Sequence, residues 1–365
     1  MPGLAEHTHT QLSEISFIFT AHSLGYLPSA LRAARLFDRV PGHLLMAAAL
    51  FVTAIMMALA PMMSQLWLLT TVLMISGAAE GVLNVGANAL LVWIYRDKVG
   101  PFITGLHSFF GVGAFLAPII VAQAILINGD IAWAYWVLAL SMLPVVAWFL
   151  RLPSPAAHED SKAGPRGQVN HLLVALIAVF FFFYIGAEAS FGGWIFSYAV
   201  ALDLGSKASA AYLTSAFWGA LTLGRFVTVL IAARFRPRSI VLVDLVGCLA
   251  SIGIILLWPN SLTAMWLSTI GLGFSMASIF PITVALAERR TTITGQVTGW
   301  FFVGASAGNM SLPWLIGQLF QSAGPRATMQ AIAVNLIVAV GVFAAIRFHA
   351  TRPVPAIDDA VHESR

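Results

Sequence analysis

The feature that most constrains this chain is a series of apolar blocks, each about 20 residues long, that recur from end to end. A helix of that length crosses the hydrocarbon core of a bilayer. Hydrophobic residues make up 59% of the sequence and charged residues only 9%, so most of the chain cannot face water. A membrane β-barrel would instead show alternating segments of about ten residues. The sequence therefore predicts an all-α membrane protein.

The blocks predict eleven transmembrane helices, separated by short breaks that carry Arg, Pro, Gly or Asp. They cover residues 13–33, 44–60, 67–94, 102–126, 132–150, 171–200, 208–233, 239–258, 262–287, 296–320 and 328–348. The longest blocks would have to tilt or extend beyond the bilayer.

Basic residues divide unevenly between the two sides of this topology. If successive breaks alternate across the membrane, one side holds nearly all Lys and Arg residues, and the other holds only Lys207 and Arg326. The positive-inside rule makes the basic side cytoplasmic. We therefore expect a multi-pass protein of the cytoplasmic (inner) membrane, with its C-terminus inside and its N-terminus outside. Residues 1–12 have no basic region followed by an apolar stretch, so they do not predict a signal peptide.

A polar stretch at residues 151–171 divides the chain into two halves. LGYLPSALRAARLFDR (24–39) aligns with LGRFVTVLIAARFRPR (223–238), with Leu, Gly, Leu, Ala, Ala, Arg and Arg in register. Parallel repeats of this kind are one plan for transporters. We expect an N-terminal bundle over 1–151, a cytoplasmic loop over 152–170, a six-helix C-terminal bundle over 171–349 and a disordered cytoplasmic tail over 350–365.

The repeat also implies that the first half lacks its opening helix. Block 171–200 precedes block 208–233 in the second half, whereas only polar residues precede the corresponding block 13–33. A bundle without one helix would expose polar faces to lipid, where each unsatisfied group costs several kcal/mol. We therefore expect the coding sequence to start upstream of Met1, and a truly shortened gene is the alternative.

Three polar side chains interrupt the third block. In AAEGVLNVGAN, Glu80, Asn84 and Asn88 stand four residues apart, so on a helix they form one stripe. An acid at a helix centre costs about 3 kcal/mol on insertion scales and nearly always faces a cavity or a partner. We expect the stripe to bind substrate hydroxyls or a coupling cation. The alternative is a protonated Glu80 that bonds a neighbouring helix only as part of packing.

The second half carries further candidates. Glu188 lies in GAEASFGGW, where Trp194 could stack on the face of a sugar. Arg225, the only basic residue deep inside a block, either clamps substrate oxygens or has a structural role, in which it satisfies the end of a broken helix or pairs with Glu188. Asn309 and Gln318 either complete a central cavity or join helices through their amides.

For two titratable residues near helix ends, a structural role is the simpler interpretation. His107 could relay a proton, because its pKa lies near neutrality, or it could merely bond the backbone. Asp244 is expected to form an ion pair with Arg236 or Arg238 at the cytoplasmic end of its helix.

Three segments resemble the major facilitator superfamily, and within it the sugar transporters grouped around bacterial fucose permease and the sodium-dependent glucose transporters. ARLFDRVPGH (34–43) is similar to the family's loop between helices 2 and 3. LLVWIYRDKVGPFITGLHSFFGVGAFLAP (90–118) and YIGAEASFGGWIFSYAV (184–200) resemble signatures of the sugar-transporter branch. The resemblance implies two bundles, of five and six helices here, that rock around a central site. It also implies that Asp38 and Arg39 belong to a gating loop that locks one conformation.

Together these features predict a secondary active transporter that moves a monosaccharide or similar small polar solute with H⁺ or Na⁺. We expect a monomer in the lipid bilayer without cofactor or metal, and without nucleic acid because the basic residues form no single patch. The sequence has no Walker loop, metal-ligand spacing or G-x-S-x-G motif, so it predicts no enzyme. Two alternatives stay open: a proton-coupled exporter of drug-like compounds, and a non-transporting remnant or receptor-like membrane protein.

Overall fold

The computed structural model describes residues 2–37, 39–155, 169–232, 234–288, 291 and 295–351. Within these ranges the chain forms helices and no strand, which confirms the prediction of an all-α protein. Asp38 of the predicted gating loop lies outside the described residues, as do most of the predicted central loop and the predicted tail.

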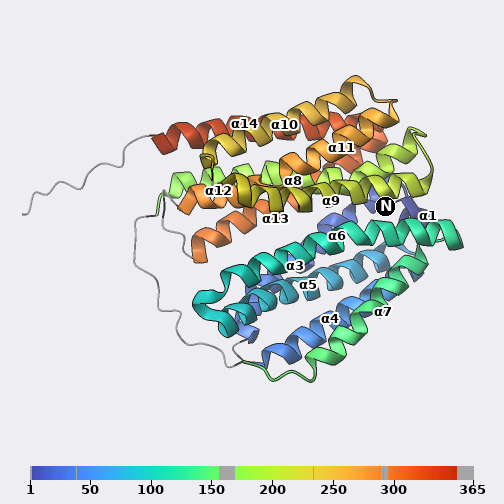
Figure 1. Ribbon diagram of the computed structural model, residues 1–365. Coiled ribbons are helices and arrows are strands. Elements are labelled where there is room, and N and C mark those ends of the chain that lie inside the picture. Colours follow the sequence, from blue (N-terminus) through green and yellow to red (C-terminus); the bar gives the residue numbers. More distant parts are fainter. Residues whose placement is uncertain are drawn as a thin grey trace, which may run out of the picture.

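The helices form two groups that lie side by side (Figure 1). The first group contains α1 (Pro2–Thr8), α2 (Leu12–Ile15), α3 (Phe17–Phe37), α4 (Gly42–Leu59), η1 (Ala60–Met62), α5 (Leu66–Tyr95), η2 (Arg96–Lys98), α6 (Gly100–Asn128) and α7 (Ala132–Phe149). The second group contains α8 (His171–Ala201), α9 (Lys207–Ala232), α10 (Pro237–Leu257), α11 (Leu262–Met276), α12 (Ile279–Glu288), α13 (Gly295–Ala323) and α14 (Arg326–Thr351).

Nine segments of the described chain are long and apolar enough to cross a membrane. They lie in α4 to α10, in α14, and in Leu262–Ala287, which joins α11 and α12. α3 and α13 occupy the predicted spans 13–33 and 296–320 but are less apolar, so the predicted number of eleven spans is not confirmed. These two helices pack against each other, and polar groups on each bond the other instead of facing lipid. Their lower hydropathy follows from that position.

The span that joins α11 and α12 is broken. α11 ends at Met276 and α12 begins at Ile279, with Ala277 and Ser278 in a turn between them. Pro281 favours the break, because it has no N–H to donate to the carbonyl of Ala277 and its ring crowds the preceding turn. Side chains of other helices must therefore satisfy the backbone groups that the break leaves free.

α8 lies at the centre of the second group, with α13, α14 and α9 packed around it. Its aromatic side chains form much of the apolar core, and Phe180, Phe181, Tyr184 and Trp194 are fully buried. A polar side chain on α8 therefore meets neighbouring helices on several sides.

The two groups meet where α3 packs on α13 and α6 packs on α9. The hydrogen bonds that join them include Ser16 Oγ to the Trp314 carbonyl (3.4 Å), Thr20 Oγ1 to the Met310 carbonyl (3.2 Å) and Gln123 Nε2 to Tyr212 Oη (2.7 Å). α3 and α9 begin at this end of the molecule, and α6 and α13 end there. These bonds therefore hold the groups together from the middle of the helices towards the end opposite the basic loops.

Candidate functional site

Glycines bring α3 and α5 into close contact. A Cβ atom added at Gly77 of α5 would lie 2.1 Å from the carbonyl oxygen of His22 on α3. A Cβ atom added at Gly25 of α3 would lie 1.9 Å from the carbonyl oxygen of Met74 on α5. Any larger residue at either position would force the helices apart, so the short distance between the two helices depends on glycine.

Glu80 lies in the middle of α5, on the side that faces α3. Its Oε2 lies 3.1 Å from Nε2 of His22, and its Oε1 accepts a hydrogen bond of 3.1 Å from Ser76 Oγ. The side chains of Glu80 and His22 are 41% and 32% exposed, so the neighbouring helices do not fully cover this cluster. His22 was not among the residues predicted from the sequence, although a single histidine within an apolar span is a signal for such a site.

The two amides of the predicted stripe bond each other and not Glu80. Nδ2 of Asn88 donates to the backbone carbonyl of Asn84 (2.9 Å) and to its side-chain Oδ1 (3.2 Å). Asn84 is exposed and Asn88 is half-buried. The stripe therefore continues along α5 as accessible amide groups next to the Glu80 cluster.

Glu188 of α8 is half-buried and bonds a tyrosine one turn earlier. Oη of Tyr184 lies 2.5 Å from Glu188 Oε2 and 2.7 Å from the carbonyl oxygen of Met276, the last residue of α11. Glu188 thus lies next to the break between α11 and α12. Arg225 of α9 acts electrostatically on Glu188, but the described residues contain no ion pair between them within 4.0 Å. The sequence alternative of a direct Glu188–Arg225 pair is therefore wrong for this conformation.

Trp194 occupies a different environment from the one expected. It is fully buried, its Nε1 donates to the carbonyl of Pro313 (3.0 Å), and its ring lies 5.3 Å from that of Phe320. In this conformation the indole joins α8 to α13, so it cannot stack on a sugar as the sequence reasoning expected.

The remaining predicted residues lie on several elements. Asn309 Nδ2 donates to Ser23 Oγ across the two groups (3.3 Å), and Gln318 likewise reaches the first group. His107 is exposed on α6, where the positive charge of Arg225 acts on it. Arg39 is exposed after the end of α3. The structure thus brings Glu80 together with His22, and Glu188 with a helix break, as two separate clusters.

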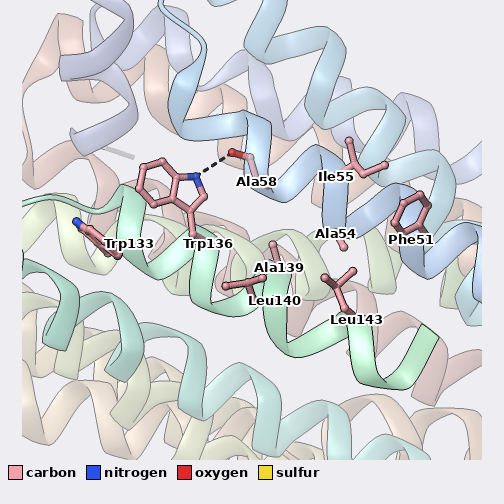
Figure 2. A pocket seen from close by; sticks show the side chains of 9 residues that line it. All are labelled: Phe51, Ala54, Ile55, Ala58, Trp133, Trp136, Ala139, Leu140 and Leu143. Carbon is pink, nitrogen blue, oxygen red and sulfur yellow. Dashed lines mark hydrogen bonds between the residues drawn. The ribbon is translucent and has the colours of Figure 1, made fainter. Parts of the chain in front are cut away.

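Two hollows in the described chain lie apart from these clusters. One, of about 480 Å³, lies between α4 and α7, and Figure 2 shows its apolar lining and the bond from Trp136 Nε1 to the Ala58 carbonyl (3.2 Å). The other, of about 530 Å³, lies beside α1, α2 and the end of α8. No predicted site residue lines either hollow.

Comparison with known sequences places this fold among transporters. A family model for the Major Facilitator Superfamily matches residues 1–296. Human sodium-dependent glucose transporter 1 is 30% identical over 354 residues, which cover 87% of this chain and 68% of the human protein. Mouse sodium-dependent glucose transporter 1A is 29% identical and covers 87% of this chain and 83% of its own length. Mouse major facilitator superfamily domain-containing protein 4A is 26% identical, with coverages of 87% and 81%.

Solved structures show the same fold at low sequence identity. The nucleoside transporter NupG superposes with a TM-score of 0.76 at 14% identity, covering 94% of this chain and 93% of that one. A bacterial homologue of the human lysosomal transporter Spinster, in an inward-facing and occupied conformation, gives 0.72 at 13% identity, with coverages of 97% and 94%.

Proposed function

The chain belongs to the Major Facilitator Superfamily, and we propose that it moves a monosaccharide across the membrane together with a monovalent cation, H⁺ or Na⁺. Its relatives are membrane transporters and not enzymes. The human and mouse relatives named sodium-dependent glucose transporter 1 and 1A each match 87% of this chain. That similarity supports a sugar as substrate and a cation as the coupled species.

The single observation that carries this proposal is the cluster of Glu80, His22 and Ser76. An ionised carboxylate has about four acceptor positions, and His22 and Ser76 occupy one on each oxygen. The remaining positions can accept bonds from sugar hydroxyls or bind a cation. An acid in the middle of a span is by default a candidate for a substrate or ion pathway, which supports this role for Glu80. Asn84 and Asn88 add donors and acceptors along the same helix.

The contacts between the two groups support transport by alternating access. α3 and α13 bond through Thr20 and Met310, and α6 and α9 bond through Gln123 and Tyr212. The distribution of basic residues supports an outside position for the bonded end and a cytoplasmic C-terminus. We propose that this conformation is closed to the outside, and that release of these bonds opens the site to that side. One chain contains both groups, so we propose that the monomer is the working unit.

The test is uptake of radiolabelled hexoses by the purified protein in proteoliposomes. One arm imposes an inward Na⁺ gradient, one an inward proton gradient, and one imposes neither. We expect accumulation of at least one hexose in an arm with a gradient, and its loss in Glu80→Gln. Glu14→Gln is the matched control, because Glu14 contacts its own helix start at the surface. A folded protein that accumulates no hexose in any arm would overturn the proposal.

A further inference from the structure

Three oxygen atoms beside the break between α11 and α12 share too few hydrogens if Glu188 is ionised. Tyr184 Oη is within hydrogen-bond distance of both Glu188 Oε2 (2.5 Å) and the Met276 carbonyl oxygen (2.7 Å). A phenol has one hydrogen and donates it to one acceptor. A second hydrogen is therefore needed if both short contacts are to be hydrogen bonds.

The two protonation states of Glu188 predict different geometries. With an ionised Glu188, Tyr184 would donate to the carboxylate, and the Met276 carbonyl would face a phenol oxygen without a hydrogen between them. A buried acceptor without a donor costs about 1–3 kcal/mol. With a protonated Glu188, the carboxylic acid donates to Tyr184 Oη, and Tyr184 donates to Met276. Both contacts are then satisfied at the distances observed.

We infer that Glu188 is a proton-binding site and that this conformation holds the proton there. The chain of donors runs from Glu188 through Tyr184 to the Met276 carbonyl. Tyr184 is fully buried, whereas Glu188 keeps part of its surface exposed. The exchangeable proton belongs to Glu188 and not to Tyr184, because a carboxyl group ionises at a much lower pH than a phenol.

The charged groups around Glu188 do not take the place of this proton. The groups that act on Glu188 or its partner are Arg225 of α9 and Cys248 of α10, and Cys248 also faces Asp244. Arg225 lies beyond ion-pair distance, so it does not replace the proton as a direct partner. Among the other helices packed nearby, α11 and α13 contain no titratable residue. Those of α12 and α14 stand at or near the helix ends, at Glu288, Arg326, Arg347 and His349.

The proton on Glu188 affects how α11 and α12 are held at the break between them. The break is held on one side by Tyr184 at Met276 and on the other by Asp244, which accepts a hydrogen bond from Ser278. Asp244 therefore does not form the predicted ion pair with a cytoplasmic arginine in the described chain. When Glu188 loses its proton, Tyr184 turns its hydrogen to the carboxylate, and Met276 loses its donor. The protonation state of Glu188 thus favours one arrangement of α11 relative to α12 over another.

The role of this proton in coupled transport rests on the proposed function. It places proton binding in the second group on α8, whereas the Glu80 cluster lies in the first group. A conformational change of α11 and α12 that depends on the proton would link the two groups, since the bundles of such carriers move against each other.

Infrared difference spectroscopy tests the site without any substrate. The purified full-length protein, in a detergent free of esters, is compared with its Glu188→Gln variant at neutral pH. We expect the wild type to show the C=O stretching band of a protonated carboxylic acid and Glu188→Gln to lack it. Glu80→Gln and Asp244→Asn should keep the band, and Tyr184→Phe should shift it because the acid loses its acceptor. A wild-type spectrum without this band, or a band that survives in Glu188→Gln, overturns the inference.

A second measurement tests the role in coupling. In proteoliposomes, we expect Glu188→Gln to lose sugar accumulation driven by a proton gradient, with exchange of labelled for unlabelled sugar much less affected. Glutamine keeps a donor for Tyr184, so it imitates the proton-loaded state. Accumulation by Glu188→Gln equal to that of the wild type would refute the coupling role. If the wild type transports no hexose, the proposed function fails, while the infrared result still decides whether Glu188 holds a proton.

Discussion

Nε2 of His22 lies 3.1 Å from Oε2 of Glu80, and this contact joins the first third of α3 to the middle of α5. The second oxygen of Glu80 is held by Ser76 of its own helix. Because the two partners come from different helices, the position of the carboxylate depends on how closely α3 and α5 pack. Substitutions at the carboxylate, at the histidine and at the helix contact therefore test the same site in three ways.

Replacing Glu80 with Gln should strongly reduce transport while leaving the protein folded. The amide keeps a bond to Ser76 or His22 but loses the negative charge. Hydrogen bonds to charged groups contribute about 1.5–3 kcal/mol, which corresponds to about a ten- to hundredfold change in affinity. Binding of a hexose by isothermal calorimetry and the Tm in detergent measure the two effects. Unchanged affinity would remove Glu80 from the site.

His22 should be needed as a donor and not as a bulky side chain. In His22→Ala, Glu80 keeps only Ser76, so we expect hexose affinity to change and the initial uptake rate to fall. His22→Gln places an amide donor near the same carboxylate and should recover part of the rate. Equal rates in the two variants would show that a donor at position 22 does not support uptake.

Replacing Gly77 with Ala should destabilise the first group. The new Cβ would lie 2.1 Å from the His22 carbonyl oxygen, so α3 and α5 would have to separate. Overpacking of this kind costs about 1–3 kcal/mol, and we expect a lower Tm together with slower uptake. Gly341→Ala is the matched control, because a Cβ there meets nothing within 4 Å and alanine favours the helix. A Tm as high in Gly77→Ala as in Gly341→Ala would contradict the packing account.

The helices could be predicted from the sequence because length and apolarity alone decide which segments lie in lipid. α4 to α10 follow the predicted blocks closely, and the all-α fold is confirmed. The interruption between α11 and α12 was not predicted, although Pro281 in that block was visible. α3 and α13 are less apolar because they bond each other, and hydropathy cannot show which helix faces which.

The site was predictable only where all its residues stand on one helix. The spacing of Glu80, Asn84 and Asn88 is by itself enough to place them on one face of α5. The partnership of Glu80 with His22 depends on the packing of two helices, which the spacing within one block does not contain. The burial of Trp194 against α13 was missed for the same reason, since the choice between a cavity wall and a core position is made by a distant helix.

Replacing Trp194 with Phe should lower stability without changing substrate binding. The hydrogen bond from the indole to the Pro313 carbonyl (3.0 Å) would be lost, and such a bond contributes about 0.5–1.5 kcal/mol. We therefore expect a lower Tm in detergent and an unchanged KM for uptake. A raised KM with an unchanged Tm would instead show that the indole contacts substrate in another conformation.

Locking the bonded end of the two groups should stop transport reversibly. Gln123 of α6 and Tyr212 of α9 bond each other at 2.7 Å, so Gln123→Cys with Tyr212→Cys places two thiols across the contact. Cys248 is the only native cysteine and is buried, so a thiol-bridging mercury(II) salt should act on the introduced pair. If the groups must separate here to open the site, uptake should fall on bridging and return when a reducing thiol removes the mercury. Each single variant, treated alike, should keep its uptake. Full uptake in the bridged double variant would show that this contact never opens during transport.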